Sequence, residues 1–312
     1  MKYRTLGRTG LKVSEIGFGC WGIGGSMWKS KDEDSRKALK KAIDVGINFF
    51  DTAWVYGEGH SEKLVGELAK EHDIIIATKI PPKNRMWPGT GDIDQAFPKD
   101  HVLDFARKSF QNLGKIDLLQ LHVWRDEWLN DSGWREALDI LKKEGVADYF
   151  GVSISDHAPQ TALKLASSGK IDSLQVIFSI FDQSPAEKLF KVAKKNNLGI
   201  IVRCPFDEGS LCGKFTYETK FNDWRDKYFR GERLKETVDR VNKLKFLENK
   251  RTLAQAALQF CLSNDAVSTV IPGMRKEEHV VVNAKACEGS LTLEELNQIK
   301  NHRWNKNFYD AL

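Results

Sequence analysis

Four side chains suited to acid–base chemistry follow three successive predicted strands: Asp51, Tyr56, Lys79 and His122. A tyrosine with its ordinary pKa of about 10 donates a proton poorly at neutral pH, but a nearby ammonium group lowers that pKa. A buried ammonium group needs a counterion, which Asp51 can supply. An imidazole nearby can orient a carbonyl oxygen. The set therefore predicts a tuned general acid beside a carbonyl group.

Each of the four residues taken alone also has a structural explanation. An aspartate at a strand end often caps a turn, and Lys79 would also suit a solvated loop. Tyr56 would serve equally in packing, and His122 as a hydrogen-bonded core residue. Their joint placement on neighbouring strand ends is what favours a catalytic interpretation.

The elements that must position these residues are short apolar runs that alternate with amphipathic segments. Most runs are continuously apolar, which is typical of strands buried on both faces. Eight such units predict a parallel (β/α)8 TIM barrel, in which catalytic residues lie at the C-terminal ends of the strands. The predicted strands are Glu15–Phe18, Asn48–Thr52, Ile74–Thr78, Leu118–His122, Tyr149–Ser153, Leu174–Phe178, Gly199–Arg203 and Ser268–Ile271. The predicted helices are Asp32–Val45, His60–Lys70, Lys99–Leu113, Trp134–Glu144, Ala158–Ser168, Pro185–Asn196, Leu253–Ser263 and Lys276–Ala286.

Three further segments lie outside the eightfold pattern. Gly7-Arg8-Thr9-Gly10, between short apolar runs, predicts an N-terminal β-hairpin that plugs the bottom of the barrel. A long excursion after the seventh strand, residues 205–251, contains a predicted extra helix at Glu232–Glu248, and a C-terminal helix at Leu293–His302 precedes an irregular tail. Without a linker or repeat, we expect one domain over residues 1–312.

Composition excludes several classes of protein. The chain has 312 residues, with 48 Lys+Arg against 43 Asp+Glu, so its net charge of +5 gives no basic stripe for nucleic acid. The five cysteines are odd in number and form no CxxC pair, so we expect neither a disulfide framework nor a metal site. We therefore expect the protein to reside in a reducing cytoplasm. The sequence shows no secretory signal and no apolar run of about 18 residues, so we expect neither secretion nor a membrane span. The oligomeric state is left open.

A glycine pattern near the N-terminus is a poor match to a Rossmann site. Residues Gly17 to Gly22 fit G-x-G-x-x-G, but the following Ile-Gly-Gly-Ser-Met-Trp starts a helix poorly. We interpret this stretch as a flexible loop that leaves the first barrel strand and lets a ligand approach the backbone.

The motifs around the four residues resemble those of the aldo-keto reductase family. The run from Asp51 to Glu62, DTAWVYGEGHSE, is similar to the family signature, and Ala77-Thr78-Lys79 and Leu119–His122 resemble its next two motifs. The likeness extends from Leu6 to Ala284. It implies an NADPH-binding (β/α)8 barrel that transfers hydride to an aldehyde or ketone. Tyr56 would be the proton donor, Lys79 and Asp51 its tuning pair, and His122 the orienting group.

The resemblance also implies cofactor-binding residues, and it favours NADPH/NADP+ over NAD mainly through Arg275. The implied cofactor-binding residues are Gly19, Cys20 and Trp21 beneath the nicotinamide ribose, Ser153 and Gln175 at the carboxamide, Asp51 and Arg203, the pyrophosphate loop Ser210, Leu211, Gly213 and Lys214, and the adenosine-phosphate group Gly273, Arg275, His279 and Asn283. A guanidinium group suits a phosphate because it binds bidentately.

The sequence departs from the family pattern at several positions. Ile154 stands where many members have Asn, and His279 and Val282 stand where many have Arg and Glu. Arg203 stands where many members place an aromatic ring against the nicotinamide. Its planar guanidinium could stack there, and its charge would disfavour the oxidised, positively charged ring.

Two other functions stay open. Lys79 would serve in a Schiff-base aldolase, although that chemistry leaves Tyr56 and the loop 210–214 without a role. Channel β-subunits also resemble this family and act largely as cofactor-sensing binding modules.

The nine tryptophans gather in loops on the predicted catalytic face. Seven of them follow predicted strands or lie in the long excursion: Trp21, Trp28, Trp54, Trp87, Trp124, Trp128 and Trp224. They would also serve simply to cover the loops. We hypothesise that Trp21, Trp54, Trp87 and Trp124 wall a pocket for an apolar or aromatic small-molecule carbonyl substrate.

Overall fold

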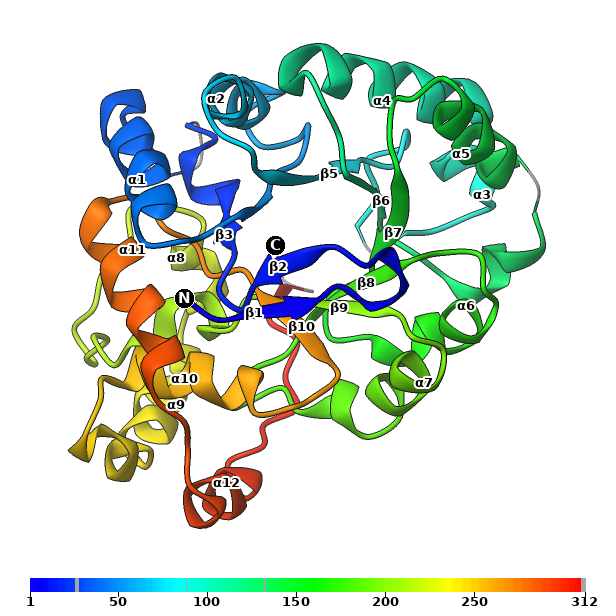
Figure 1. The fold of residues 1–312 in the computed structure, drawn as a ribbon. Helices are drawn as coiled ribbons and strands as arrows, with labels where there is room; N and C mark the ends of the chain where they lie inside the picture. The colour runs from blue at the N-terminus through cyan, green and yellow to red at the C-terminus, as the bar shows by residue number, and fades with distance from the viewer. Residues whose placement is uncertain (26–27, 88, 132, 310–312) are drawn as a thin grey trace.

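The framework of the computed structural model is one parallel sheet that curls into a barrel (Figure 1). Residues 1–25, 28–87, 89–131 and 133–309 are described. The strand order is β10-β9-β8-β7-β6-β5-β4-β3. Parallel bridges from Ile16 to Val270 and from Gly19 to Gly273 join the two ends of the sheet. The (β/α)8 prediction is therefore confirmed. The strands are β3 (Phe18–Gly19), β4 (Phe49–Asp51), β5 (Ile75–Ile80), β6 (Leu118–His122), β7 (Tyr149–Ser153), β8 (Ser173–Ile177), β9 (Gly199–Arg203) and β10 (Val267–Val270).

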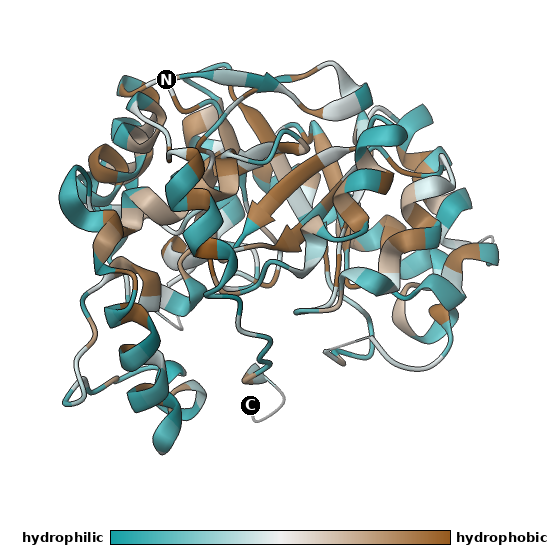
Figure 2. Ribbon diagram, turned by 90° about the horizontal axis from the view of Figure 1, so that it is seen from below, coloured by the Kyte–Doolittle hydropathy of each residue, from teal (hydrophilic) through white to brown (hydrophobic). Residues whose placement is uncertain are grey.

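Helices surround the barrel, with hydrophobic strands inside and hydrophilic residues on the outer helix faces (Figure 2). They are α1 (Asp32–Asp44), α2 (His60–Ala69), α3 (Ile93–Ala96), α4 (Lys99–Leu113), α5 (Gly133–Lys143), α6 (Leu163–Ser167), α7 (Leu189–Lys195), α8 (Arg225–Tyr228), α9 (Glu232–Asn242), α10 (Leu253–Leu262), α11 (Glu277–Ala284) and α12 (Leu293–Lys300). No helix in the described part of the chain combines the length and apolarity needed to cross a membrane.

Several predicted helices are shorter or divided in the structure. The predicted segments Ala158–Ser168 and Pro185–Asn196 each begin with a separate 3-10 turn, Pro159–Ala162 and Ser184–Ala186. Each turn contains a proline, which lacks an N–H donor and is accommodated in a first helical turn. The predicted helix Glu232–Glu248 is α9 followed by a 3-10 turn at Lys245–Asn249.

The strand boundaries correct the placement of Lys79. Asp51 is the last residue of β4 and lies within the predicted strand Asn48–Thr52, whereas Lys79, just beyond the predicted strand Ile74–Thr78, lies inside β5. The reason is that β5 continues to pair with β6 through Lys79 opposite Gln120 and Ile80 opposite Leu121. Both charged side chains therefore sit on rigid strands rather than on loops.

The predicted N-terminal hairpin is confirmed. Strand β1 (Tyr3–Thr5) pairs antiparallel with β2 (Lys12–Ser14), and the hairpin crosses the barrel end (Figure 1). Leu6 is fully buried in a cluster with Phe49 and Leu118, which begin β4 and β6. A Cβ on Gly7 would lie 2.2 Å from the Gly199 nitrogen, so only glycine fits this close approach. The hairpin thus seals the N-terminal end of the strands and leaves the other end for the site.

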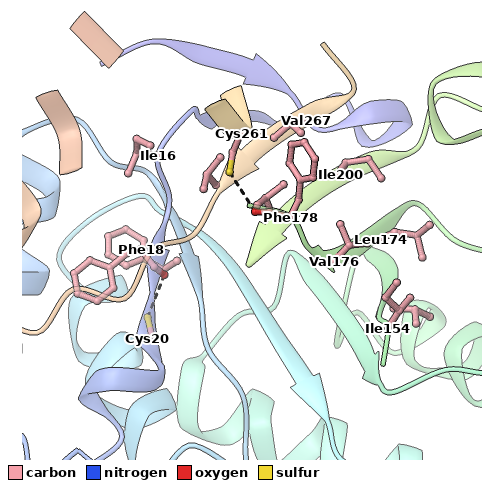
Figure 3. Packing of buried hydrophobic residues seen from close by; sticks show 14 of the residues in the cluster. Ile16, Phe18, Cys20, Ile154, Leu174, Val176, Phe178, Ile200, Cys261 and Val267 are labelled. Carbon is pink, nitrogen blue, oxygen red and sulfur yellow. Dashed lines mark hydrogen bonds between the residues drawn. The ribbon is translucent and has the colours of Figure 1, made fainter. Parts of the chain in front are cut away.

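A continuous apolar core holds the helices onto the sheet (Figure 3). Leu174 and Val176 of β8 pack in this cluster with Ile200 of β9 and Val267 of β10. The Cys261 thiol of α10 donates a hydrogen bond to the Phe178 carbonyl at 3.2 Å. This packing fixes the strand ends that carry the site.

Candidate active site

A buried ion pair joins the ends of β4 and β5. Lys79 Nζ lies 2.5 Å from Asp51 Oδ1, and the two side chains are 0% and 2% exposed. The ammonium group also donates to the Thr52 carbonyl at 2.8 Å and to the Tyr56 hydroxyl at 3.2 Å. Its three donors therefore have three acceptors, one of which is the phenol oxygen.

Two side-chain amides complete the environment of the Asp51 carboxylate. Gln175 Nε2 of β8 donates to Asp51 Oδ2 at 2.7 Å, and Gln120 Nε2 of β6 donates to the same oxygen at 3.2 Å. Ser153 of β7 donates to the Gln175 carbonyl oxygen at 3.5 Å. Buried charges are tolerated only when their hydrogen-bonding capacity is used. The sequence assigned Gln175 and Ser153 to a cofactor but did not anticipate this network.

Burial and charge act in opposite directions on the phenol. Desolvation has the largest effect and raises the pKa of Tyr56 above its usual value, whereas the Lys79 ammonium lowers that pKa. Only the lowering of the Tyr56 pKa by Lys79 was expected from the sequence. For Lys79, burial would lower the pKa, but Asp51 and Tyr56 together raise it. Tyr56 is thus a protonated phenol beside the charged ammonium group of Lys79.

His122 lies at the end of β6 with a neutral imidazole. Burial, followed by repulsion from Lys79 and Arg203, lowers its pKa well below the usual value. Its Nδ1 is buried and has no hydrogen-bond partner in the described chain. The ring of Trp87 meets the imidazole edge-on, with 4.6 Å between ring centroids. A neutral imidazole with spare hydrogen-bonding capacity suits the recognition of a polar ligand atom.

These groups open into a cavity of about 1560 Å³ at the C-terminal ends of the strands. The cavity also brings together loops that follow β3, β5, β9 and β10, as expected for a site on this fold. Most predicted site residues line it: Gly19, Cys20, Trp21, Asp51, Tyr56, Trp87, His122, Gln175, Arg203, Lys214, Gly273, Arg275, His279 and Asn283.

Seven predicted residues are not among the described residues that line the cavity: Trp54, Lys79, Trp124, Ser153, Ser210, Leu211 and Gly213. Ser210 is buried and donates to Asp207 at 2.7 Å, and Leu211 belongs to the hydrophobic core. Their neighbours Gly209, Cys212 and Lys214 face the cavity instead. The predicted loop therefore reaches the cavity through Lys214, as predicted, and through Gly209 and Cys212, which were not predicted as site residues.

The proposed tryptophan wall needs correction. Trp124 is fully buried and packs against Trp128 and Trp134 in the core. Trp54 packs edge-on against Phe105 of α4, with ring centroids 4.8 Å apart. Trp54 thus packs against α4, and Trp124 packs against α5 through Trp134. The described aromatic lining includes Trp21 and Trp87 from the prediction, together with Trp28, Phe206, Phe215 and Tyr309.

Basic groups gather at one end of the cavity. The guanidinium groups of Arg225 and Arg275 lie over the Trp28 ring at 5.0 and 4.8 Å from its centroid. Burial and the Arg225 charge lower the pKa of Arg275. The indole nitrogen of Trp28 is buried without a partner in the described chain. Arg225 is paired with Asp223 at 2.7 Å, so the Arg275 guanidinium and the indole donor are the groups that fit a phosphorylated ligand.

Arg203 is held by the protein rather than left free to stack. Its Nη2 donates to Asp156 Oδ1 at 2.7 Å and to the Ile154 carbonyl at 3.0 Å. Burial would lower the pKa of Arg203, but Asp156 keeps it above the usual value. Because Asp156 compensates its charge, we expect Arg203 to disfavour a positively charged nicotinamide less than the sequence suggested.

The C-terminal tail contributes to the cavity in a way that the sequence analysis missed. Tyr309 lines the cavity and donates to the Glu208 carboxylate. Lys306 forms a buried ion pair with Asp207 at 2.8 Å and lies over the Trp304 ring at 4.2 Å. The tail thus reaches the face opposite the hairpin (Figure 2). Its irregular sequence carries no periodicity that predicts these contacts.

Comparisons with known proteins agree with this architecture. The family model described as "Aldo/keto reductase family" matches residues 15–303. "Uncharacterized oxidoreductase YqkF" of Bacillus subtilis is 30% identical over 307 residues, covering 97% of this chain and 96% of that protein. A "Probable voltage-gated potassium channel subunit beta" of Oryza sativa is 28% identical, with 92% of each chain covered. The solved holo form of aldo-keto reductase AKR11C1 from Bacillus halodurans superposes with a TM-score of 0.76 at 30% identity, covering 97% and 96% of the chains.

The burial of His122 leads to a prediction about its ionisation. We expect its imidazole to stay neutral through pH 6.5, where an ordinary histidine is half protonated, because burial, Lys79 and Arg203 all disfavour the cation. Nitrogen NMR of labelled protein measures this directly, and the signals lost in His122→Gln identify the residue. A titration midpoint near 6.5 would contradict the described environment.

Proposed function

This chain belongs to the aldo/keto reductase family, and we propose that it reduces an aldehyde or ketone to the alcohol with NADPH, using Tyr56 as the proton donor. The observation that carries the proposal is the 3.2 Å contact between the Tyr56 hydroxyl and the buried Lys79 ammonium. It places a protonated phenol in a cavity large enough for a dinucleotide and a substrate.

Each residue of the set has a defined part in the proposed reaction. The neutral His122 and the Tyr56 hydroxyl hold the carbonyl oxygen, and Tyr56 then gives its proton to that oxygen as negative charge develops there. Lys79 stabilises the phenolate that remains, and Asp51 balances the ammonium charge. The reduced nicotinamide supplies the hydride when bound.

The basic end of the cavity fits the phosphates of the cofactor. Lys214, Arg225 and Arg275 line it, and Trp28, whose ring lies beside both guanidinium groups, offers an indole N–H that has no partner in the described chain. Arg275 and Lys214 have no carboxylate within 4.0 Å in the described chain. Such charge suits a third phosphate, which supports NADPH over NADH. The solved relative AKR11C1 in its holo form supports a bound cofactor in this fold.

The two alternative functions make different demands on the same residues. A Schiff-base aldolase needs a neutral lysine nucleophile, whereas the neighbours of Lys79 raise its pKa and use its three donors. A cofactor-sensing module, suggested by the potassium channel relatives, needs binding but no steady turnover. The engaged ammonium of Lys79 therefore favours a reductase over the aldolase, whereas steady turnover of a carbonyl substrate separates a reductase from the sensing module.

The five cysteines, all free thiols, support a reducing cytoplasmic location. The aromatic rings of Trp21 and Trp87 support an aromatic or apolar body for the carbonyl substrate.

Removal of the proton donor tests the proposed reaction. In Tyr56→Phe we expect kcat for a panel of aldehydes and ketones to fall by about 10²–10⁴-fold, because Tyr56 is the phenol that contacts Lys79 in the described chain. The Kd for NADPH, measured by tryptophan fluorescence, should change little. The matched control is Tyr217→Phe, which changes an exposed tyrosine whose hydroxyl donates a hydrogen bond to Asp239. Binding of NADPH by the wild-type protein without turnover of any carbonyl would favour the sensing module.

Removal of the phosphate-facing guanidinium tests the cofactor preference. In Arg275→Met we expect the Kd for NADPH to rise by about tenfold or more, the effect of losing a charged hydrogen bond. The Kd for NADH should stay within about twofold of the wild-type value, because NADH has no third phosphate for Arg275 to bind. Lys276→Met removes an equal charge from an exposed neighbour. Equal losses for NADPH and NADH would contradict a role in NADP selection.

A further inference from the structure

One cation that lines the cavity is not accounted for by the cofactor or by the proton donor. Arg85 lies in the loop after β5 and lines the same cavity as His122 and Trp87. Its neighbour in the loop, Trp87, contacts the His122 ring. Two residues of chain span at most about 7 Å, so Arg85 sits beside the His122 end of the cavity.

The guanidinium group of Arg85 is supported by aromatic rings instead of a carboxylate. It lies 5.3 Å from the Trp54 ring centroid and 6.0 Å from that of Phe105. Within the described residues, no Asp or Glu oxygen lies within 4.0 Å of it. Rings restrict such a side chain without neutralising it, so its charge and its planar donors stay available to a ligand.

The acidic groups near the proton donor cannot neutralise Arg85, because they are engaged elsewhere. Asp51 is bound by Lys79 and the two glutamine amides, and Asp156 is bound by Arg203. Glu208 accepts the Tyr309 hydroxyl. Among the described residues, the His122 end of the cavity therefore presents the uncompensated positive charge of Arg85 next to aromatic rings.

We propose that Arg85 selects carbonyl substrates that carry an oxyanion, a carboxylate or a phosphate, several bonds away from the reacting carbonyl group. This inference rests on the proposed reductase function. It refines the expectation of an apolar or aromatic substrate: the rings contact the body of the substrate, and Arg85 pairs with its charged end. Arg85 would act in specificity and not in proton transfer.

Matched aldehydes test the proposal. The substrates are 4-formylbenzoate and 4-formylphenyl phosphate, each compared with the uncharged methyl 4-formylbenzoate. We expect wild-type protein to favour at least one anion by about tenfold in kcat/KM. Arg85→Gln should remove that preference and leave the ester rate unchanged. Lys83→Gln, which removes an equal charge from an exposed residue of the same loop, should keep it.

The possible outcomes separate this inference from the proposed function. If only the carboxylate or only the phosphate depends on Arg85, that anion is the one selected. Equal rates for anions and ester, or equal effects of the two variants, would overturn the role of Arg85 and leave the reductase function intact. Failure to reduce any of the aldehydes would contradict the reductase function. In that case, weaker binding of the alcohol 4-(hydroxymethyl)benzoate to Arg85→Gln, measured by calorimetry, would still support the anion site, and unchanged binding would overturn it.

Discussion

The buried ion pair of Asp51 and Lys79 is the constraint on which the rest of the site depends. Two charges at 0% and 2% exposure are stable only where the protein replaces water at every polar atom. The barrel does so with groups from the loop after β4 and from two strands, β6 and β8: the Thr52 carbonyl, the Tyr56 hydroxyl and the amides of Gln120 and Gln175. The same contacts that stabilise the charges therefore fix the position of the phenol.

This pair also decides which chemistry the phenol can do. Burial alone would make Tyr56 a very weak acid, and the adjacent ammonium group partly offsets that effect. The proton consequently stays on Tyr56 at neutral pH until negative charge appears on an acceptor held beside it. Under the proposed function, Arg275 and Arg85, which line the cavity and have no carboxylate partner in the described chain, would pair with the charged parts of the cofactor and of the substrate.

Local sequence patterns were sufficient to predict the barrel and the four acid–base residues. Apolar runs and helical periodicity place Asp51, Lys79 and His122 at one end of neighbouring strands, because parallel strands share an end. Contacts made through loops follow no such period. Trp124 turned into the core, Arg203 paired with Asp156, and Tyr309 reached the cavity from the far end of the chain. The sign of the overall pKa shift of Tyr56 also required burial, which spacing alone does not give.

The most direct test of this account is the ionisation of Tyr56 in variants of the ion pair. Carbon NMR of ring-labelled tyrosine, assigned with Tyr56→Phe, follows the phenol during an alkaline titration. Because the Lys79 charge lowers the pKa of Tyr56 and the Asp51 charge raises it, we predict opposite shifts: upward in Lys79→Met and downward in Asp51→Asn. Shifts in the same direction, or none in folded variants, would contradict control of the phenol by the buried pair.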